Sequence, residues 1–182
     1  MLISEGYRAL NRQLHDHHSE YGSGGGEYAP EVVRLCRKRS YRTVLDYGCG
    51  KGSMAQSIRS LEPALTVLEY DPAVPGKTEP PAQPVDMLVC TDVLEHIEPD
   101  FIHHVLRHIA SLTRQTAFLA INCQPAIKTL PDGRNAHLIV EPKEWWLAQV
   151  EQHMRIERFG TAPEDPDRGV VVLAAPKLPA SV

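Results

Sequence analysis

The chain has 182 residues, of which 42% are hydrophobic and 23% charged, and its formal net charge is −4. These values are typical of one folded domain and exclude a disordered or collagen-like chain. No apolar run approaches the roughly 18 residues that cross a bilayer, and no signal-peptide pattern is present. The four cysteines lack C-x-x-C spacing. Reduced thiols, a cytoplasmic location and no membrane partner are therefore expected.

From residue 43 onward, short apolar runs alternate with amphipathic segments, and this alternation predicts the secondary structure. Strands are expected at 43–47, 65–70, 86–90 and 116–122, and helices at 53–61, after Pro99 and at 141–153. Two further strands, 154–159 and 170–174, are expected to close the sheet as a β-hairpin. Strands separated by helices are typical of an α/β domain with a mostly parallel sheet.

Residues 71–85 interrupt this alternation with five prolines. Proline removes a backbone donor and breaks helix interiors, and it is disfavoured in central strands. We therefore expect an extended linker between the second and third strands.

A glycine-rich turn follows the first predicted strand, with the sequence Asp46-Tyr47-Gly48-Cys49-Gly50-Lys51-Gly52. Glycine allows a ligand to approach the backbone closely, and the helix that follows offers free N–H donors. A phosphate-binding P-loop is excluded because Gly52, and not serine or threonine, follows Lys51. A dinucleotide fingerprint is disfavoured because Ser53 stands where its third glycine belongs.

The D-x-G-x-G-x-G spacing resembles motif I of class I S-adenosylmethionine-dependent methyltransferases. Residues 86–97, DMLVCTDVLEHI, are similar to the fourth-strand segment of that family, including its LEH ending. The resemblance covers residues 43–175 and implies a Rossmann-like sandwich that binds S-adenosylmethionine and releases S-adenosylhomocysteine. It implies the following cofactor-binding residues: Gly48, Gly50 and Gly52 along the cofactor, Asp46 at its methionine end, and Asp92.

The resemblance also implies an acid on the ribose hydroxyls. Glu69 ends the second predicted strand, 23 residues after Asp46 (69 − 46), where the family places this acid. Asp71, two positions later, is the rival. We assign the ribose to Glu69.

The sequence departs from the family between the second and fourth strands of the family's numbering. The family has a helix and a third strand there, whereas this chain has the proline linker. We therefore expect the strand order 2-1-4-5-7-6 in family numbering, with adenine held by linker residues. The resemblance further implies that residues 1–42 form an N-terminal helical cap over the substrate pocket, next to a methyltransferase domain at 43–182.

Two polar segments, residues 92–96 and 130–138, follow predicted strands. They are expected at the sheet edge where ligands bind in open parallel sheets. His96 and His137 are the candidate catalytic bases, because imidazole titrates near neutrality. The alternatives are that residues 92–96 only cap a helix and that residues 130–138 are a solvated surface loop. The candidate substrate contacts are Tyr21, Arg134, Asn135 and Trp146. Arg134 suits an anionic acceptor, because its guanidinium can bind an anion with two hydrogen bonds. Trp145 and Trp146 are adjacent on a predicted helix, so we expect one in the core and the other at the pocket. We assign the pocket position to Trp146.

We predict a methyltransferase that acts on a hydroxyl or amine of a small polar acceptor, such as a sugar, nucleotide or metabolite. One alternative is an RNA or DNA methyltransferase that uses the basic residues 34–42 to contact phosphates, with or without the help of a metal ion. Another is a non-catalytic S-adenosylmethionine-binding protein. No metal is expected, although Asp92, Glu95, His96 and His137 carry oxygen and nitrogen ligands able to hold one, with Glu95, His96 and His137 as the alternative site.

Overall fold

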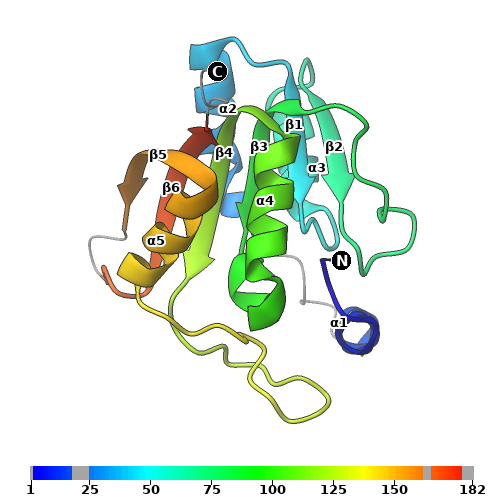
Figure 1. Cartoon of the computed structure of the whole chain (residues 1–182). Coiled ribbons are helices and arrows are strands. Elements are labelled where there is room, and N and C mark those ends of the chain that lie inside the picture. Colours follow the sequence, from blue (N-terminus) through cyan, green and yellow to red (C-terminus); the bar gives the residue numbers. More distant parts are fainter. Residues whose placement is uncertain (1, 18–24, 162–164, 178–182) are drawn as a thin grey trace, which may run out of the picture.

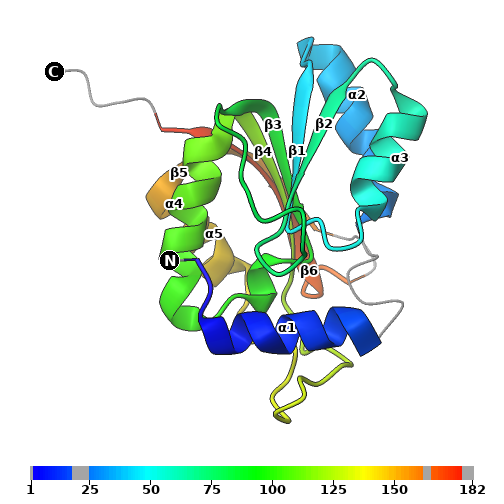
Figure 2. The ribbon, with the colours of Figure 1, turned by 90° about the vertical axis from the view of Figure 1, so that its right-hand side faces the viewer.

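A computed structural model describes residues 2–17, 25–161 and 165–177. A central sheet is covered by helices on both faces (Figures 1 and 2). Helices α4 (Ile102–Leu112) and α5 (Lys143–His153) lie on one face, and α2 (Ala29–Arg39) and α3 (Ser53–Leu61) lie on the other. None of the described helices is long and apolar enough to span a membrane.

The sheet contains six strands in the order β2-β1-β3-β4-β6-β5. Their bounds are β1 Thr43–Tyr47, β2 Thr66–Tyr70, β3 Val85–Thr91, β4 Thr113–Asn122, β5 Met154–Gly160 and β6 Gly169–Pro176. The first four strands are parallel, and β6 is antiparallel to both β4 and β5. This topology confirms the expected α/β sandwich with a C-terminal hairpin, and its order is 2-1-4-5-7-6 once the missing third strand is counted.

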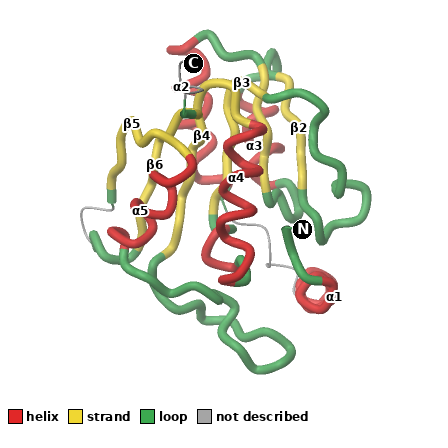
Figure 3. Tube along the Cα trace, viewed as in Figure 1, coloured by secondary structure: helices red, strands yellow, loops and turns green. Residues whose placement is uncertain are grey.

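The chain between β2 and β3 forms neither helix nor strand, as expected for a proline-rich linker (Figure 3). It folds back on itself, because the Asp71 N–H donates to the Lys77 carbonyl at 2.8 Å. A second long irregular segment, residues 123–142, joins β4 to α5.

Two apolar layers hold the sandwich together, because successive side chains of a strand point to opposite faces. Leu45 of β1 packs toward α4 and α5, whereas its neighbour Val44 packs toward α2 and α3. The same alternation separates Leu88 from Met87 on β3. The sheet is thus buried on both faces, as parallel sheets require.

Residues 1–42 do not form one separate cap, because part of this region packs into the sandwich. Helix α2 packs into the same core as α3, with Val32, Val33 and Cys36 buried, so it belongs to the sandwich. Only α1 (Glu5–His17) lies outside the sandwich, across the end of the sheet (Figure 2). Of the described helices in the region expected to form the cap, α1 is therefore the one that lies at the pocket.

Candidate active site

A cavity of about 620 Å³ opens at the carboxyl end of the parallel strands. Its wall combines the glycine loop after β1, the start of the linker, the short 3-10 helix η2 (Leu94–His96), the segment after β4 and helix α1. Ligands of open α/β sheets bind at this edge, because the loops that follow parallel strands meet there.

The glycine loop is held against the end of the neighbouring strand. The N–H groups of Gly48 and Cys49 donate to the carbonyl of Tyr70 at 2.8 and 3.2 Å. Gly48, Gly50 and Gly52 have φ angles of 73°, 49° and 83°, a backbone region that favours glycine. Gly48 and Gly50 line the cavity, whereas Gly52 begins α3 at its N-cap and is not part of the lining.

Asp46 reaches the cavity from the end of β1. Its carboxylate accepts a hydrogen bond from the N–H of Ala55 at 3.2 Å, and only 3% of the residue is exposed. Burial in this site raises the pKa of Asp46 to about 7.

The two rival ribose acids have different environments. Glu69 does not line the cavity and instead pairs with Lys77 at 2.7 Å and with Arg59 at 2.8 Å. Asp71 lines the cavity, where its carboxylate accepts the N–H groups of Gly50 at 3.0 Å and Ala73 at 2.9 Å. The two acids differ because β2 ends between them, at Tyr70. Glu69 is still in the strand and points to α3, whereas Asp71 follows the strand, where the chain turns toward the glycine loop.

Asp92 lies in the short connection between β3 and η2 and lines the cavity. Its φ of 54° is uncommon for a residue with a Cβ, and such residues cluster at functional sites. The side chain is exposed to the cavity, yet the protein around it desolvates the carboxylate and, together with the charge of Glu27, raises its pKa.

The structure brings the two predicted bases together from separate segments. The rings of His96 and His137 meet edge to face, with centroids 4.7 Å apart. Nδ1 of His96 lies 2.8 Å from the carbonyl of Ala136, and Nδ1 of His137 lies 2.5 Å from the carbonyl of Gln124. A carbonyl oxygen only accepts, so each Nδ1 carries the proton. In the neutral rings the lone pair is therefore on Nε2.

Glu95 is fully buried beside this pair. One carboxylate oxygen, Oε1, accepts the N–H of Asn122 at 2.9 Å. The other, Oε2, has no hydrogen-bond partner within the described part of the chain. Burial raises the pKa of Glu95 to about 8.

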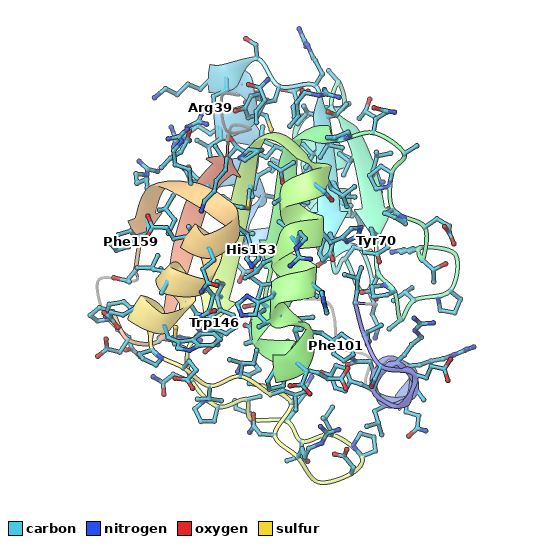
Figure 4. All side chains as sticks on the ribbon, viewed as in Figure 1. Arg39, Tyr70, Phe101, Trp146, His153 and Phe159 are labelled. Atoms are coloured by element: carbon cyan, nitrogen blue, oxygen red, sulfur yellow. The ribbon has the colours of Figure 1, made fainter. Side chains whose placement is uncertain are left out.

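The predicted substrate contacts are mostly elsewhere. Arg134 is exposed at a turn and pairs with Asp132 at 2.7 Å, away from the cavity lining. Trp146 is buried in the core because it lies on the sheet-facing side of α5 (Figure 4). Asn135 braces its own loop, since its side-chain oxygen accepts the N–H groups of Ala126 and His137, both at 2.9 Å. Tyr21 lies outside the described residues.

Helix α1 and the residues just before it supply a wall that the sequence did not predict residue by residue. Ile3 and Tyr7 line the cavity and are buried. The Tyr7 hydroxyl donates to the carbonyl of His96 at 2.5 Å, and the Ser4 N–H and hydroxyl donate to the Glu98 carboxylate at 2.8 and 2.7 Å. The apolar spacing of Ile3 and Tyr7 is the signal from which this inner face could be found.

A family model described as a methyltransferase domain matches residues 16–159. The chain belongs to this methyltransferase family. The resemblance to class I S-adenosylmethionine-dependent methyltransferases is thereby confirmed, and S-adenosylmethionine is the cofactor. No curated protein matches the sequence.

Solved structures of methyltransferases share the fold. The 1,6-didemethyltoxoflavin-N1-methyltransferase of Burkholderia thailandensis, with 1,6-didemethyltoxoflavin and S-adenosylhomocysteine bound, is 17% identical with a TM-score of 0.64, over 97% of this chain and 91% of that chain. Magnesium protoporphyrin IX methyltransferase of Synechocystis PCC 6803, with S-adenosylhomocysteine bound, is 16% identical with a TM-score of 0.64, over 94% and 100%. Mitomycin 7-O-methyltransferase is 19% identical with a TM-score of 0.59, over 91% and 60%.

The buried carboxyl of Asp46 makes a prediction about this methyltransferase without its cofactor. Its folded-state pKa of about 7 exceeds the ordinary value of 3.8, so the folded protein holds this proton more tightly. The stabilisation is complete below the unfolded pKa and is lost as the pH rises to the folded one. Between about pH 5 and pH 8, wild type should lose on the order of 2–3 kcal/mol relative to Asp46→Asn. Urea unfolding of both proteins at the two pH values measures this difference, and parallel pH dependences would contradict it.

Proposed function

We propose that this methyltransferase transfers the methyl group of S-adenosylmethionine to a hydroxyl or amine of a small polar acceptor. The observation that carries the proposal is one continuous cavity, which has the glycine loop at one end and the pair of His96 and His137 at the other. A methyl donor on the loop and an acceptor at the imidazoles would share this cavity. Alignment of the two reactants is the main requirement of such a displacement.

The residues around the loop fit the parts of the cofactor. The backbone of Gly48 and Gly50 lines the cavity and allows close approach of a ligand, and the ionised form of the Asp46 carboxyl offers a negative charge to the methionine ammonium. Asp71 is the better candidate for the ribose hydroxyls, because its carboxylate lines the cavity and Glu69 does not. Pro72 and Ala73 of the linker offer apolar surface to adenine.

S-adenosylmethionine supplies a sulfonium whose methyl group is open to nucleophilic attack. The protein has to hold the acceptor in line with that methyl group and manage the acceptor's proton. His96 and His137 present Nε2 lone pairs because a backbone carbonyl occupies each Nδ1. Ile3, just before α1, and Tyr7 of α1 form an apolar wall of the cavity.

A small acceptor agrees better with the charges than a nucleic acid does. Three basic residues of the 34–42 segment already have acidic partners: Arg34 pairs with Glu31, Arg37 with Glu62 and Arg39 with Glu157. They also lie on or next to α2 rather than in the cavity lining. The neighbours named above act, by their names, on a toxoflavin precursor, a porphyrin and mitomycin, all of them small molecules.

The function is tested by supplying the enzyme with a methyl donor that carries a deuterated methyl group, together with the small-molecule fraction of a cell extract. One metabolite should gain the mass of the labelled methyl group while S-adenosylhomocysteine accumulates. Binding of the donor without product from this fraction, or from a panel of hydroxyl and amine compounds, would instead support the non-catalytic alternative.

The assignment of the ribose acid makes a prediction about affinity. Asp71→Ala should weaken S-adenosylhomocysteine binding by about 1–3 kcal/mol, because hydrogen bonds to a charged group are lost. Glu69→Ala should weaken binding less, since Glu69 lies outside the cavity lining and its carboxylate pairs with Lys77, which in turn bonds the Gly50 carbonyl. Calorimetric titration of both variants measures the order of the two effects. The reverse order would restore Glu69 as the ribose acid.

The histidine pair makes a prediction about turnover. His96→Ala and His137→Ala should each lower the rate of methyl transfer by about 10²–10⁴, the usual contribution of a group that assists proton transfer. Affinity for S-adenosylhomocysteine should stay nearly constant, because neither imidazole belongs to the glycine loop. Single-turnover rates and calorimetry separate the two effects. Full rates in both variants would leave alignment alone as the catalytic device.

A further inference from the structure

We propose that Glu95, His96 and His137 bind one divalent transition-metal ion at the acceptor end of the cavity. Among the described residues, these three each offer a ligand atom, and the three atoms lie within 4.8 Å of one another. The inference deepens the proposed function, on which it rests for the role of the ion. Ion binding itself can be measured without any acceptor.

The hydrogen bonds of both imidazoles are those of metal ligands. A ligating histidine commonly donates its second ring N–H to a backbone carbonyl, which sets the tautomer and the ring orientation. Here the carbonyls of Ala136 and Gln124 serve this purpose for His96 and His137. Nε2 is consequently the coordinating nitrogen of each ring. Two independent segments thus carry the same arrangement within one small cluster.

The carboxylate of Glu95 supplies a separate argument. The Asn122 N–H holds Oε1, while Oε2 is buried and has no hydrogen-bond partner within the described residues. An unsatisfied buried acceptor costs about 1–3 kcal/mol, and native proteins rarely retain one without a reason. A cation between Oε2 and the two imidazoles would satisfy this oxygen and neutralise its charge.

The distances require only a small closure of the cluster. Metal–nitrogen and metal–oxygen bonds of about 2.0–2.2 Å place neighbouring ligand atoms roughly 3 Å apart. The three atoms, which lie within 4.8 Å of one another, therefore need to approach by at most about 2 Å. Asp92 is not part of the cluster, although the sequence grouped it with these ligands.

The donor set indicates the class of metal. Two imidazoles and one carboxylate favour zinc, manganese, iron or cobalt over magnesium and calcium, which prefer oxygen ligands. Three protein ligands leave coordination positions open, and His96 and His137 face the cavity. The open positions are where an acceptor hydroxyl or amine would bind.

The ion's role is to orient this acceptor group and to make it more acidic. Because both Nε2 lone pairs bind the ion, water and not an imidazole takes the acceptor's proton, and the acceptor's lone pair forms the bond to the methyl carbon. The carbon–sulfur bond breaks, and its electron pair stays on sulfur. The products are the methylated acceptor, S-adenosylhomocysteine and one proton, so no further reactant is required.

The test is calorimetric titration of chelator-treated full-length protein with Mn²⁺ and, separately, Zn²⁺. Wild type should bind one ion, and Glu95→Gln and His137→Ala should each weaken this binding at least tenfold. His153→Ala is the matched control, because His153 forms a second imidazole pair with His103 at 3.1 Å, between α4 and α5 (Figure 4). Its affinity for the ion should equal that of wild type.

S-adenosylhomocysteine affinity serves as the check that each variant is folded. Ion binding that is equal in wild type and His137→Ala, or that is lost only in His153→Ala, would overturn the metal site. No binding of either ion to wild type would also overturn it. Methyl transfer that persists with chelator present would then leave the proposed function intact, so the two inferences fail separately.

Discussion

Two backbone hydrogen bonds from the glycine loop to the carbonyl of Tyr70 hold the loop at its end of the cavity. They join the end of β1 to the end of β2, so the loop and the start of the linker form one surface. Asp71 can then accept the N–H of Gly50, and Lys77 returns from the linker to the carbonyl of the same glycine at 3.1 Å. The positive φ angles of the loop are tolerated because these contacts hold it on several sides.

The same contacts explain how the fold manages without the family's third strand. β2 is the edge of the sheet, and exposed edges are prone to pair with other chains. This edge strand has only five residues, and the linker that follows it is rich in proline, which cannot extend a strand ladder. The ion pairs of Glu69 with Lys77 and Arg59 connect the linker and α3 to the end of β2. An acid expected to bind ribose thus serves to brace the strand end.

The helices and strands from residue 43 onward could be predicted from the sequence, because each has a clear periodicity of apolar residues and clear boundaries. The loop from Asp46 to Gly52 was recognisable because its glycines are required by the backbone itself. Side-chain direction beyond a strand end was not predictable, since it depends on partners distant in the sequence. Glu69 is drawn away by Lys77 and Arg59, and Arg134 is occupied by Asp132. Trp146 was a different error, because its four-residue spacing from the buried Val150 already placed it on the apolar side of α5.

Helix α1 is linked by hydrogen bonds to the segment that carries His96. The Ser4 side chain accepts the N–H of Tyr7 at the start of the helix and donates to Glu98, and the Tyr7 hydroxyl holds the carbonyl of His96. The apolar wall is therefore joined to the backbone of one histidine of the pair. His137 is held independently, through Asn135 and Gln124 of the loop after β4. Glu95 is buried beside both imidazoles, so a ligand at its carboxylate oxygen that has no partner among the described residues would lie close to both assemblies.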